Sequence, residues 1–257
     1  MRTSPGNRKI HVQMLETFGI SSFINHLFGP LVLALLQAIG THPHHPDRPI
    51  TDSFILEFSV VCILIAFFLV VRLTLSVDRP NPAQQIAELI HEFTGSNADQ
   101  IIGHGYERFQ AFVTCIFLFV VLNNVLGLVP GIVTPTSNPV IPLGIAVLTF
   151  LYYNLHGLRE QGVVGYMKHF AGPVWWIAPL LFPIEIISHC ARMMSLTIRL
   201  YANMFASDLV TLVFFSLFPF AIPAVFLGLH FAVSLIQAYV FMLLAMIYLS
   251  QAVAHEH

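Results

Sequence analysis

Residues 195–209, "SLTIRLYANMFASDL", place Arg199 and Asp208 within one of the most apolar parts of the chain. An arginine at the centre of a bilayer costs about 3 kcal/mol on insertion scales, so charged residues in spans face a protein interior, a water-filled cavity or a partner. The stretch therefore indicates a membrane-embedded helix whose guanidinium needs a partner.

The composition around this stretch is that of a polytopic membrane protein. The chain has 257 residues, of which 56% are hydrophobic and 9% are charged, against about 25% charged in an average soluble domain. The net charge of −2 gives no indication of a nucleic-acid partner. Cys62, Cys115 and Cys190 lie in apolar runs without a C-x-x-C pair. We expect them to be small buried hydrophobes, and we expect no metal site and no cofactor.

The apolar runs set the number of spans, because about 20 helical residues cross the hydrocarbon core. Three runs of ordinary length precede two longer ones that form a C-terminal hairpin: residues 53–75, 109–129, 140–156, 173–218 and 221–252. We therefore expect an all-α protein with about five membrane-embedded helices. These helices are expected to form a single membrane domain over residues 51–257.

Two further segments are assigned to the membrane surface. In residues 82–93, Pro82 suits the first turn of a helix, and apolar residues recur at helical spacing opposite Glu88 and Glu92. This pattern predicts an amphipathic surface helix. Residues 1–50 form an N-terminal tail in which the mixed polar and apolar residues favour an interfacial or shallowly inserted helix.

The run of residues 173–218 is too long for an upright span. As a helix of about 45 residues it would be roughly 65 Å long, whereas the hydrocarbon core is about 30 Å thick. The run must therefore tilt steeply, break at Pro179 or Pro183, or do both. A steeply tilted hairpin presents an extended face in the membrane plane, against which a round partner could lie.

Basic residues indicate the orientation of the spans. Arg72, Arg79 and Arg108 fall on one side, and Arg159 and Lys168 return to it two spans later. The loop near residues 130–139 has no charges. The positive-inside rule therefore places the basic segments in the cytoplasm and this loop outside.

The polar residues of the two long runs form stripes. At about 100° per residue, one stripe of the first run spans roughly 80° and contains Glu185, His189, Arg192, Arg199 and Asn203. Asp208 projects about 180° away from Arg199. On the last run, His230, Ser234 and Gln237 share one face. We expect Asp208 to meet this face between the two helices.

These stripes favour a proton or ion path, and other interpretations remain open. Arg199 could pair with Asp208 to stabilise the bundle, although their directions disfavour this. Arg192 could pair with Glu185 or snorkel, and each histidine or Gln237 could link helices. Two other classes of protein also carry intramembrane polar residues. They are an ion-coupled secondary transporter and a di-haem membrane cytochrome that would use His156, His189 and His230.

Several motifs resemble subunit a of F-type ATP synthases. The motifs are "RLYANMFASDL", "LHFAVSLIQAYVFMLLAMIYLSQA", "LNNVLGLVPG", "TPTSNP" and "PIEIISHCARMMSLTIRLYANM". The resemblance covers about residues 50–255. It implies that Arg199 is the essential arginine that faces a carboxylate of the neighbouring c-ring.

The resemblance also implies roles for the other polar residues. Asp208, His230 and Gln237 match the polar cluster of the outer half-channel, in which Ser234 shares the face of His230. Asn203 matches the asparagine one turn beyond the arginine, and Glu185 matches an acid near the inner half-channel, with His189 one turn further on. Two departures are Asp208, where many relatives carry Glu or His, and Gly127, where many bacterial relatives have an acid.

As a whole, the resemblance implies a proton-translocating stator subunit of a rotary ATP synthase. Its partners would be the c-ring, the peripheral stalk subunit b, the lipid bilayer and the translocated proton, with sodium as the alternative ion. The chain has no nucleotide-binding motif, so it would not be an enzyme on its own. The expected location is a bacterial inner membrane, with the mitochondrial inner membrane as the alternative.

Overall fold

The structure is a computed structural model, and it describes residues 52–76, 79–129, 134–171, 178–217 and 221–253, together with His26 and Pro30. Over these residues it is all-helical. The helix expected within residues 1–50 lies outside the described residues. The helices are α3 (Asp52–Leu73), α4 (Pro82–Ile102), α5 (Glu107–Leu126), η1 (Pro135–Ser137), α6 (Val140–Ala171), α7 (Ala178–Leu217) and α8 (Ala221–Val253).

Four segments of the described chain are long and apolar enough to cross a membrane: Ser53–Leu73, Glu107–Leu126, Val140–Gly162 and Ala224–Val253. They make the chain a multi-pass membrane protein. Within the described residues α7 is not among these four segments, and its sequence includes the charged residues of the stripe.

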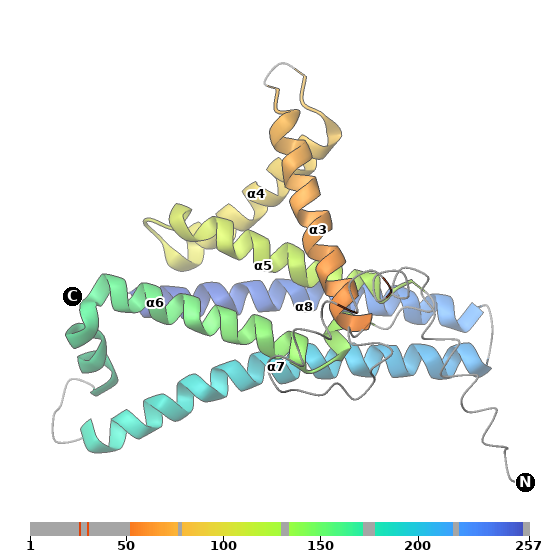
Figure 1. The fold of residues 1–257 in the computed structure, drawn as a ribbon. Helices are drawn as coiled ribbons and strands as arrows, with labels where there is room; N and C mark the ends of the chain where they lie inside the picture. Colours follow the sequence, from red (N-terminus) through yellow and green to blue (C-terminus); the bar gives the residue numbers. More distant parts are fainter. Residues whose placement is uncertain are drawn as a thin grey trace, which may run out of the picture.

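α7 and α8 form an antiparallel hairpin along which α6 also lies (Figure 1). The 40 residues of α7 make it about 60 Å long. Pro179 lies in its first turn, and the helix continues through Pro183 without a break. The sequence left open whether this long element tilts, breaks at a proline, or does both. The break at Pro179 or Pro183 does not occur. A steep inclination to the membrane normal is the way in which a helix of this length fits the bilayer.

Two helices run further than expected from their composition. α4 continues beyond residue 93 to Ile102, because Gly95 and Ala98 on its second half are buried against the rest of the bundle. α6 continues beyond residue 156, with one non-helical residue at Gly162. Charged residues at 159 and 160 mark the end of the apolar segment, but they are good helix formers and do not end the helix.

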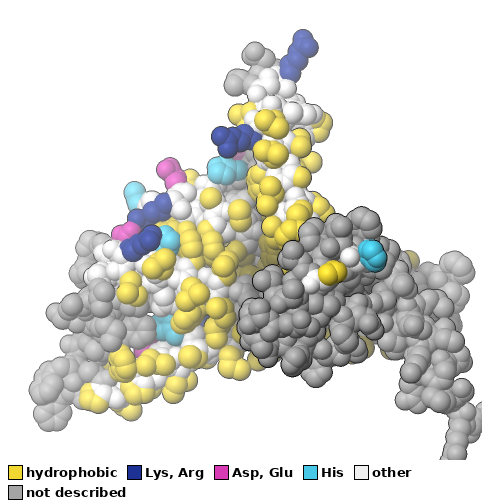
Figure 2. Space-filling model, in the orientation of Figure 1, with side chains coloured by type: hydrophobic (Ala, Val, Ile, Leu, Met, Phe, Trp, Pro, Cys, Tyr) yellow, Lys and Arg dark blue, Asp and Glu magenta, His cyan; other side chains and the backbone are white. Residues whose placement is uncertain are grey.

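The buried core joins α5, α6, α7 and α8. Its residues include Val120, Ile145, Leu200, Met204 and Phe241. By contrast, large apolar side chains are exposed along α3 and along the outer faces of the hairpin. In Figure 2 such side chains cover much of the visible surface, and Lys and Arg gather toward the upper end of α3 and to its left. This distribution is that of a protein whose outer surface contacts lipid.

The three cysteines do not lie in this core. Cys62, Cys115 and Cys190 are all exposed, so the expectation that they are buried is wrong. In a membrane protein an apolar residue can face lipid as well as the interior, because both surroundings are apolar. An apolar sequence context therefore does not distinguish the two positions.

Candidate functional site

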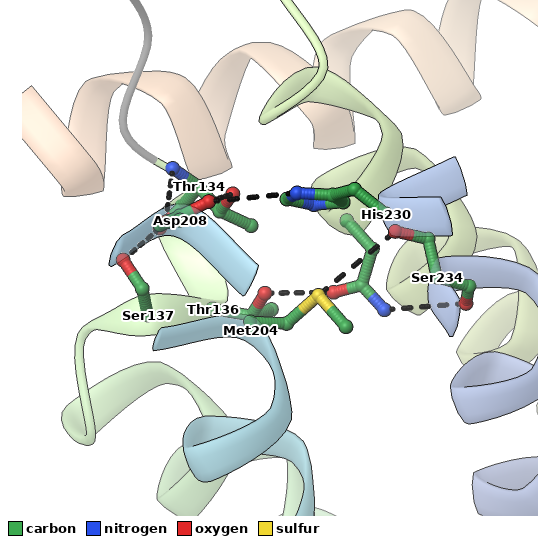
Figure 3. A network of polar contacts seen from close by, with 8 residues as sticks. Thr134, Thr136, Ser137, Met204, Asp208, His230 and Ser234 are labelled. Carbon is green, nitrogen blue, oxygen red and sulfur yellow. Dashed lines mark hydrogen bonds and ion pairs between the residues drawn. The ribbon is translucent and has the colours of Figure 1, made fainter. Parts of the chain in front are cut away.

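Asp208 lies at the centre of a polar cluster between the two long helices and the loop before α6 (Figure 3). Thr134 donates to both oxygens of its carboxylate, from Oγ1 to Oδ1 at 2.7 Å and from the backbone N–H to Oδ2 at 3.3 Å. His230 Nδ1 of α8 lies 3.9 Å from the same Oδ1. The expected meeting of Asp208 with the His230 face is thus present.

His230 is an unusual buried histidine. The residue is 2% exposed, and neither ring nitrogen makes a direct hydrogen bond within the described part of the chain. Most buried polar atoms are hydrogen-bonded. The Nδ1–Oδ1 distance of 3.9 Å is longer than a direct hydrogen bond. Both ring nitrogens are therefore left without a direct hydrogen bond in the described part of the chain, with Nδ1 turned toward the Asp208 carboxylate.

Below Asp208 the polar network continues between α5, η1 and α8 (Figure 3). Thr136 Oγ1 donates to Asn124 Oδ1 at 2.7 Å, and Asn124 Nδ2 lies 3.5 Å from the carbonyl oxygen of Ser234. The Ser234 hydroxyl is 3.9 Å from Met204 Sδ of α7. Ser234 therefore lies in the helix interface, fully buried.

Gln237 does not join the Asp208 cluster. Its side chain accepts a 2.7 Å hydrogen bond from Asn203 Nδ2. This contact lies one turn from Arg199 on α7. The face of α8 expected to meet Asp208 therefore divides into two parts. His230 faces Asp208, and Gln237 faces the stripe that carries Arg199.

Arg199 is partly exposed, and its Nη2 lies 3.4 Å from Ser195 Oγ. Among the described residues, no carboxylate lies within ion-pair distance of the guanidinium. Asp208 is instead held by Thr134 and His230, so the bundle-stabilising Arg199–Asp208 pair is absent. Small exposed side chains recur at helical spacing beside Arg199, at Ala191, Ser195, Ala202 and Ala206, and Asn203 is exposed on the same side.

The other end of the stripe forms a second cluster. Glu185 Oε1 lies 3.4 Å from His189 Nε2, and His189 Nδ1 lies 2.9 Å from the Tyr153 hydroxyl of α6. Arg192 does not pair with Glu185. It donates to Gln251 Oε1 at 2.8 Å, and its guanidinium lies 5.4 Å from the centroid of the Tyr248 ring. The structure thus brings Glu185 and His189 together and gives Arg192 partners on α8.

Sequence reasoning missed Thr134 and Tyr153 as members of these clusters. Thr134 is separated from Asp208 by 74 positions, and no helical spacing connects a loop residue with a residue of α7. The available signal was the loop motif "TPTSNP", which has polar residues and no charges between two apolar runs. Tyr153 gave less of a signal, because an aromatic residue in an apolar run usually packs in a core.

The sequence is similar to those of known proteins. A family model described as ATP synthase A chain matches residues 54–250. The ATP synthase subunit a of Koribacter versatilis is 49% identical over 237 residues, which are 92% of this chain and 97% of that protein. The ATP synthase subunit a of Solibacter usitatus is 45% identical over 235 residues, which are 91% and 100% of the two chains. A family match over most of the chain, with relatives this similar, shows that the chain belongs to the ATP synthase subunit a family.

Proposed function

We propose that this subunit forms two proton half-channels against the c-ring, with Arg199 between them. The observation that carries the proposal is the position of the guanidinium. It lies on an exposed face without an acid partner among the described residues, and the two polar clusters lie on either side of it along α7. Asp208 is nine residues or about 14 Å along the helix in one direction, and Glu185 is 14 residues or about 21 Å in the other.

The partner of Arg199 would be a carboxylate of the c-ring. Ser195, Ala202 and Ala206 are small and exposed beside Arg199, and small side chains allow a second helix to approach closely within a membrane. A carboxylate that comes within a few ångströms of a fixed cation is stabilised in its ionised form. Arg199 would therefore drive the proton off an arriving carboxylate.

The same side chain would keep the two half-channels apart. A guanidinium stays protonated in proteins and presents only donors. It can hold an ionised carboxylate, but it cannot pass a proton from one half-channel to the other. Each proton would then have to travel with the rotating ring, which couples its passage to rotation.

The two polar clusters would serve as the entry and the exit of the path. A proton would enter from the outside past Asp208 and His230, and it would leave toward the cytoplasm near Glu185 and His189. This direction rests on the basic segments, which the positive-inside rule assigns to the cytoplasm. A proton that crosses a potential of 100 mV supplies about 2.3 kcal/mol, so several would be collected for each ATP.

The subunit is a membrane component of ATP synthase and is not catalytic on its own. We assign the ATP chemistry to other subunits. Subunit b of the peripheral stalk is a proposed partner of this chain, together with the c-ring. The proton is the proposed ion, with sodium as the alternative. The relatives named above come from bacteria, which supports a bacterial inner membrane as the location.

The proposal is tested by Arg199→Ala in inverted membrane vesicles that contain the whole ATP synthase. ATP-driven acidification and passive proton leak are measured at equal amounts of assembled complex. The expected result is a loss of pumping. Arg192→Ala is the matched control, since Arg192 belongs to the same helix stripe but has partners within the chain. It should retain pumping. Normal pumping by Arg199→Ala would overturn the proposal.

A further inference from the structure

Gly127 lies against Thr134 at the point where α5 ends. A Cβ atom added at Gly127 would lie 1.7 Å from Thr134 Oγ1 and 2.8 Å from Thr134 Cβ. Both distances are far below van der Waals contact. The backbone of Gly127 has φ −66° and ψ −12°, which any residue adopts. The glycine is therefore required for space and not for its conformational freedom.

The side chain that would be displaced is the one that holds Asp208. Thr134 directs both its hydroxyl and its backbone N–H at the carboxylate, at 2.7 and 3.3 Å. With its two oxygens fixed in this way, the carboxylate turns Oδ1 toward His230 Nδ1. Thr134 is 1% exposed, so the hydroxyl cannot move aside into open space.

Other contacts already hold the loop that carries Thr134. Ser137 Oγ donates to the carbonyl oxygen of Thr134 at 2.7 Å. Thr136 Oγ1 donates to Asn124 at 2.7 Å, which ties the loop to α5. The Thr134 hydroxyl is thus not needed to close the turn, and its contact with Asp208 remains to be explained.

We infer that Gly127 and Thr134 form a size-matched pair that positions the Asp208 carboxylate toward His230. A side chain at position 127 would displace Thr134. The short side chain of Asp208 reaches both donors of Thr134. The inference rests on the proposed function, in which Asp208 and His230 carry the entering proton.

Four variants of the whole ATP synthase in inverted vesicles test the pair. Thr134→Val removes the hydroxyl at nearly constant shape, and Thr134→Ser keeps it. We expect Thr134→Val to slow ATP-driven acidification about tenfold or more, since tenfold is the lower end of the scale for a hydrogen bond to a charged group. Thr134→Ser should pump at nearly the normal rate. Gly127→Ala should slow pumping as Thr134→Val does, whereas Gly144→Ala should not, because nothing lies within 4 Å of a Cβ at Gly144.

A double variant tests whether the two positions act through one contact. Thr134→Gly alone should pump slowly because it lacks the hydroxyl. Adding Gly127→Ala to it should cause much less loss than in the Thr134 background, since the displaced side chain is gone and only the backbone Cα of residue 134, 3.2 Å from the added Cβ, remains close. An equal loss from Gly127→Ala in both backgrounds would overturn the inference, as would equal pumping by Thr134→Val and Thr134→Ser. If Gly127→Ala prevents assembly, the comparison of the two Thr134 variants still decides.

The Arg199→Ala measurement separates this inference from the proposed function. Normal pumping by Arg199→Ala would overturn the proposed function itself. Loss of pumping by Arg199→Ala together with normal pumping by Gly127→Ala and Thr134→Val would overturn only the positioning pair.

Discussion

Asn203 on α7 donates a 2.7 Å hydrogen bond to Gln237 on α8, one helical turn from Arg199. This contact joins the two long helices beside the guanidinium. It also fixes the register of the hairpin at this level, in the same antiparallel arrangement that brings His230 to Asp208 further along. Gln237 therefore belongs structurally to the surroundings of Arg199.

The first prediction concerns this hydrogen bond. Gln237→Leu removes the acceptor oxygen, so the Asn203 amide loses this hydrogen bond. A neutral hydrogen bond contributes about 1 kcal/mol, or a factor of about five, so we expect ATP-driven pumping to fall about that much. Gln237→Asn and Asn203→Gln should each weaken pumping, because the combined side-chain length no longer matches. The double swap restores that length and should recover part of the rate; a swap no better than either single variant would contradict the prediction.

The second prediction concerns the proton-carrying capacity of Asp208. Asp208→Asn keeps the shape of the side chain and can still accept from Thr134, but it cannot bind and release a proton. We expect pumping to fall by about 10²-fold or more, the scale of a lost acid–base group. Asp208→Glu adds one methylene group, keeps the carboxyl and should retain part of the rate. Acidification by vesicles with matched amounts of complex measures both variants, and a full rate for Asp208→Asn would refute a role in proton transfer.

Helix periodicity was sufficient to predict the contact between Asp208 and His230. It placed Asp208 on the side of α7 opposite to Arg199 and His230 on one face of α8, and two long adjacent helices bring such faces together. It could not predict Thr134, because a loop has no periodicity that fixes where its side chains point. It also grouped Gln237 with His230, although the two meet different residues of α7.

The predicted apolar runs lie close to the bounds of α3 and α5, whereas α4 and α6 run further than predicted. Hydrophobic runs locate the apolar part of each helix, as in α3 and α5, but a helix also continues through polar residues. α6 therefore extends past Arg159. Pro183 shows the opposite limit, since proline lowers helix stability and yet α7 continues through it. Whether a helix continues through such a residue depends on its packing against neighbouring helices, and the local sequence does not show that packing.

The third prediction concerns the cluster near the other end of the stripe. The Tyr153 hydroxyl lies 2.9 Å from His189 Nδ1, and His189 Nε2 faces Glu185 at 3.4 Å. If the hydroxyl donates to Nδ1, the neutral ring carries its proton on Nε2, toward Glu185. Tyr153→Phe should therefore slow pumping about fivefold. It should have no further effect in a His189→Phe background, and additive losses in the double variant would show that Tyr153 acts elsewhere.

The fourth prediction concerns the packing of α8 against α5 and α6, where Leu249 belongs to a buried cluster with Phe109 and Tyr153. Leu249 on α8 is 0% exposed, whereas Leu229 on the same helix is 56% exposed. Leu249→Ala leaves a cavity and should destabilise the subunit by about 2–5 kcal/mol. Leu229→Ala should have little effect, because the exposed Leu229 side chain faces the lipid and its truncation leaves no cavity in the protein. The temperature at which the subunit dissociates from the detergent-solubilised complex measures the difference, and equal values for the two variants would contradict it.

The fifth prediction concerns orientation, and the exposed cysteines determine its design. Cys62, Cys115 and Cys190 are all exposed, so each is first replaced by serine to remove background labelling. Single cysteines are then introduced at Pro139 and Arg159, which are both exposed and lie near opposite ends of the apolar part of α6, about 30 Å apart. A membrane-impermeant maleimide should label Pro139→Cys in intact cells and Arg159→Cys in inverted vesicles, because basic segments remain in the cytoplasm. The reverse labelling would invert the direction assigned to the proton path, so that Asp208 and His230 would face the cytoplasm and Glu185 the outside.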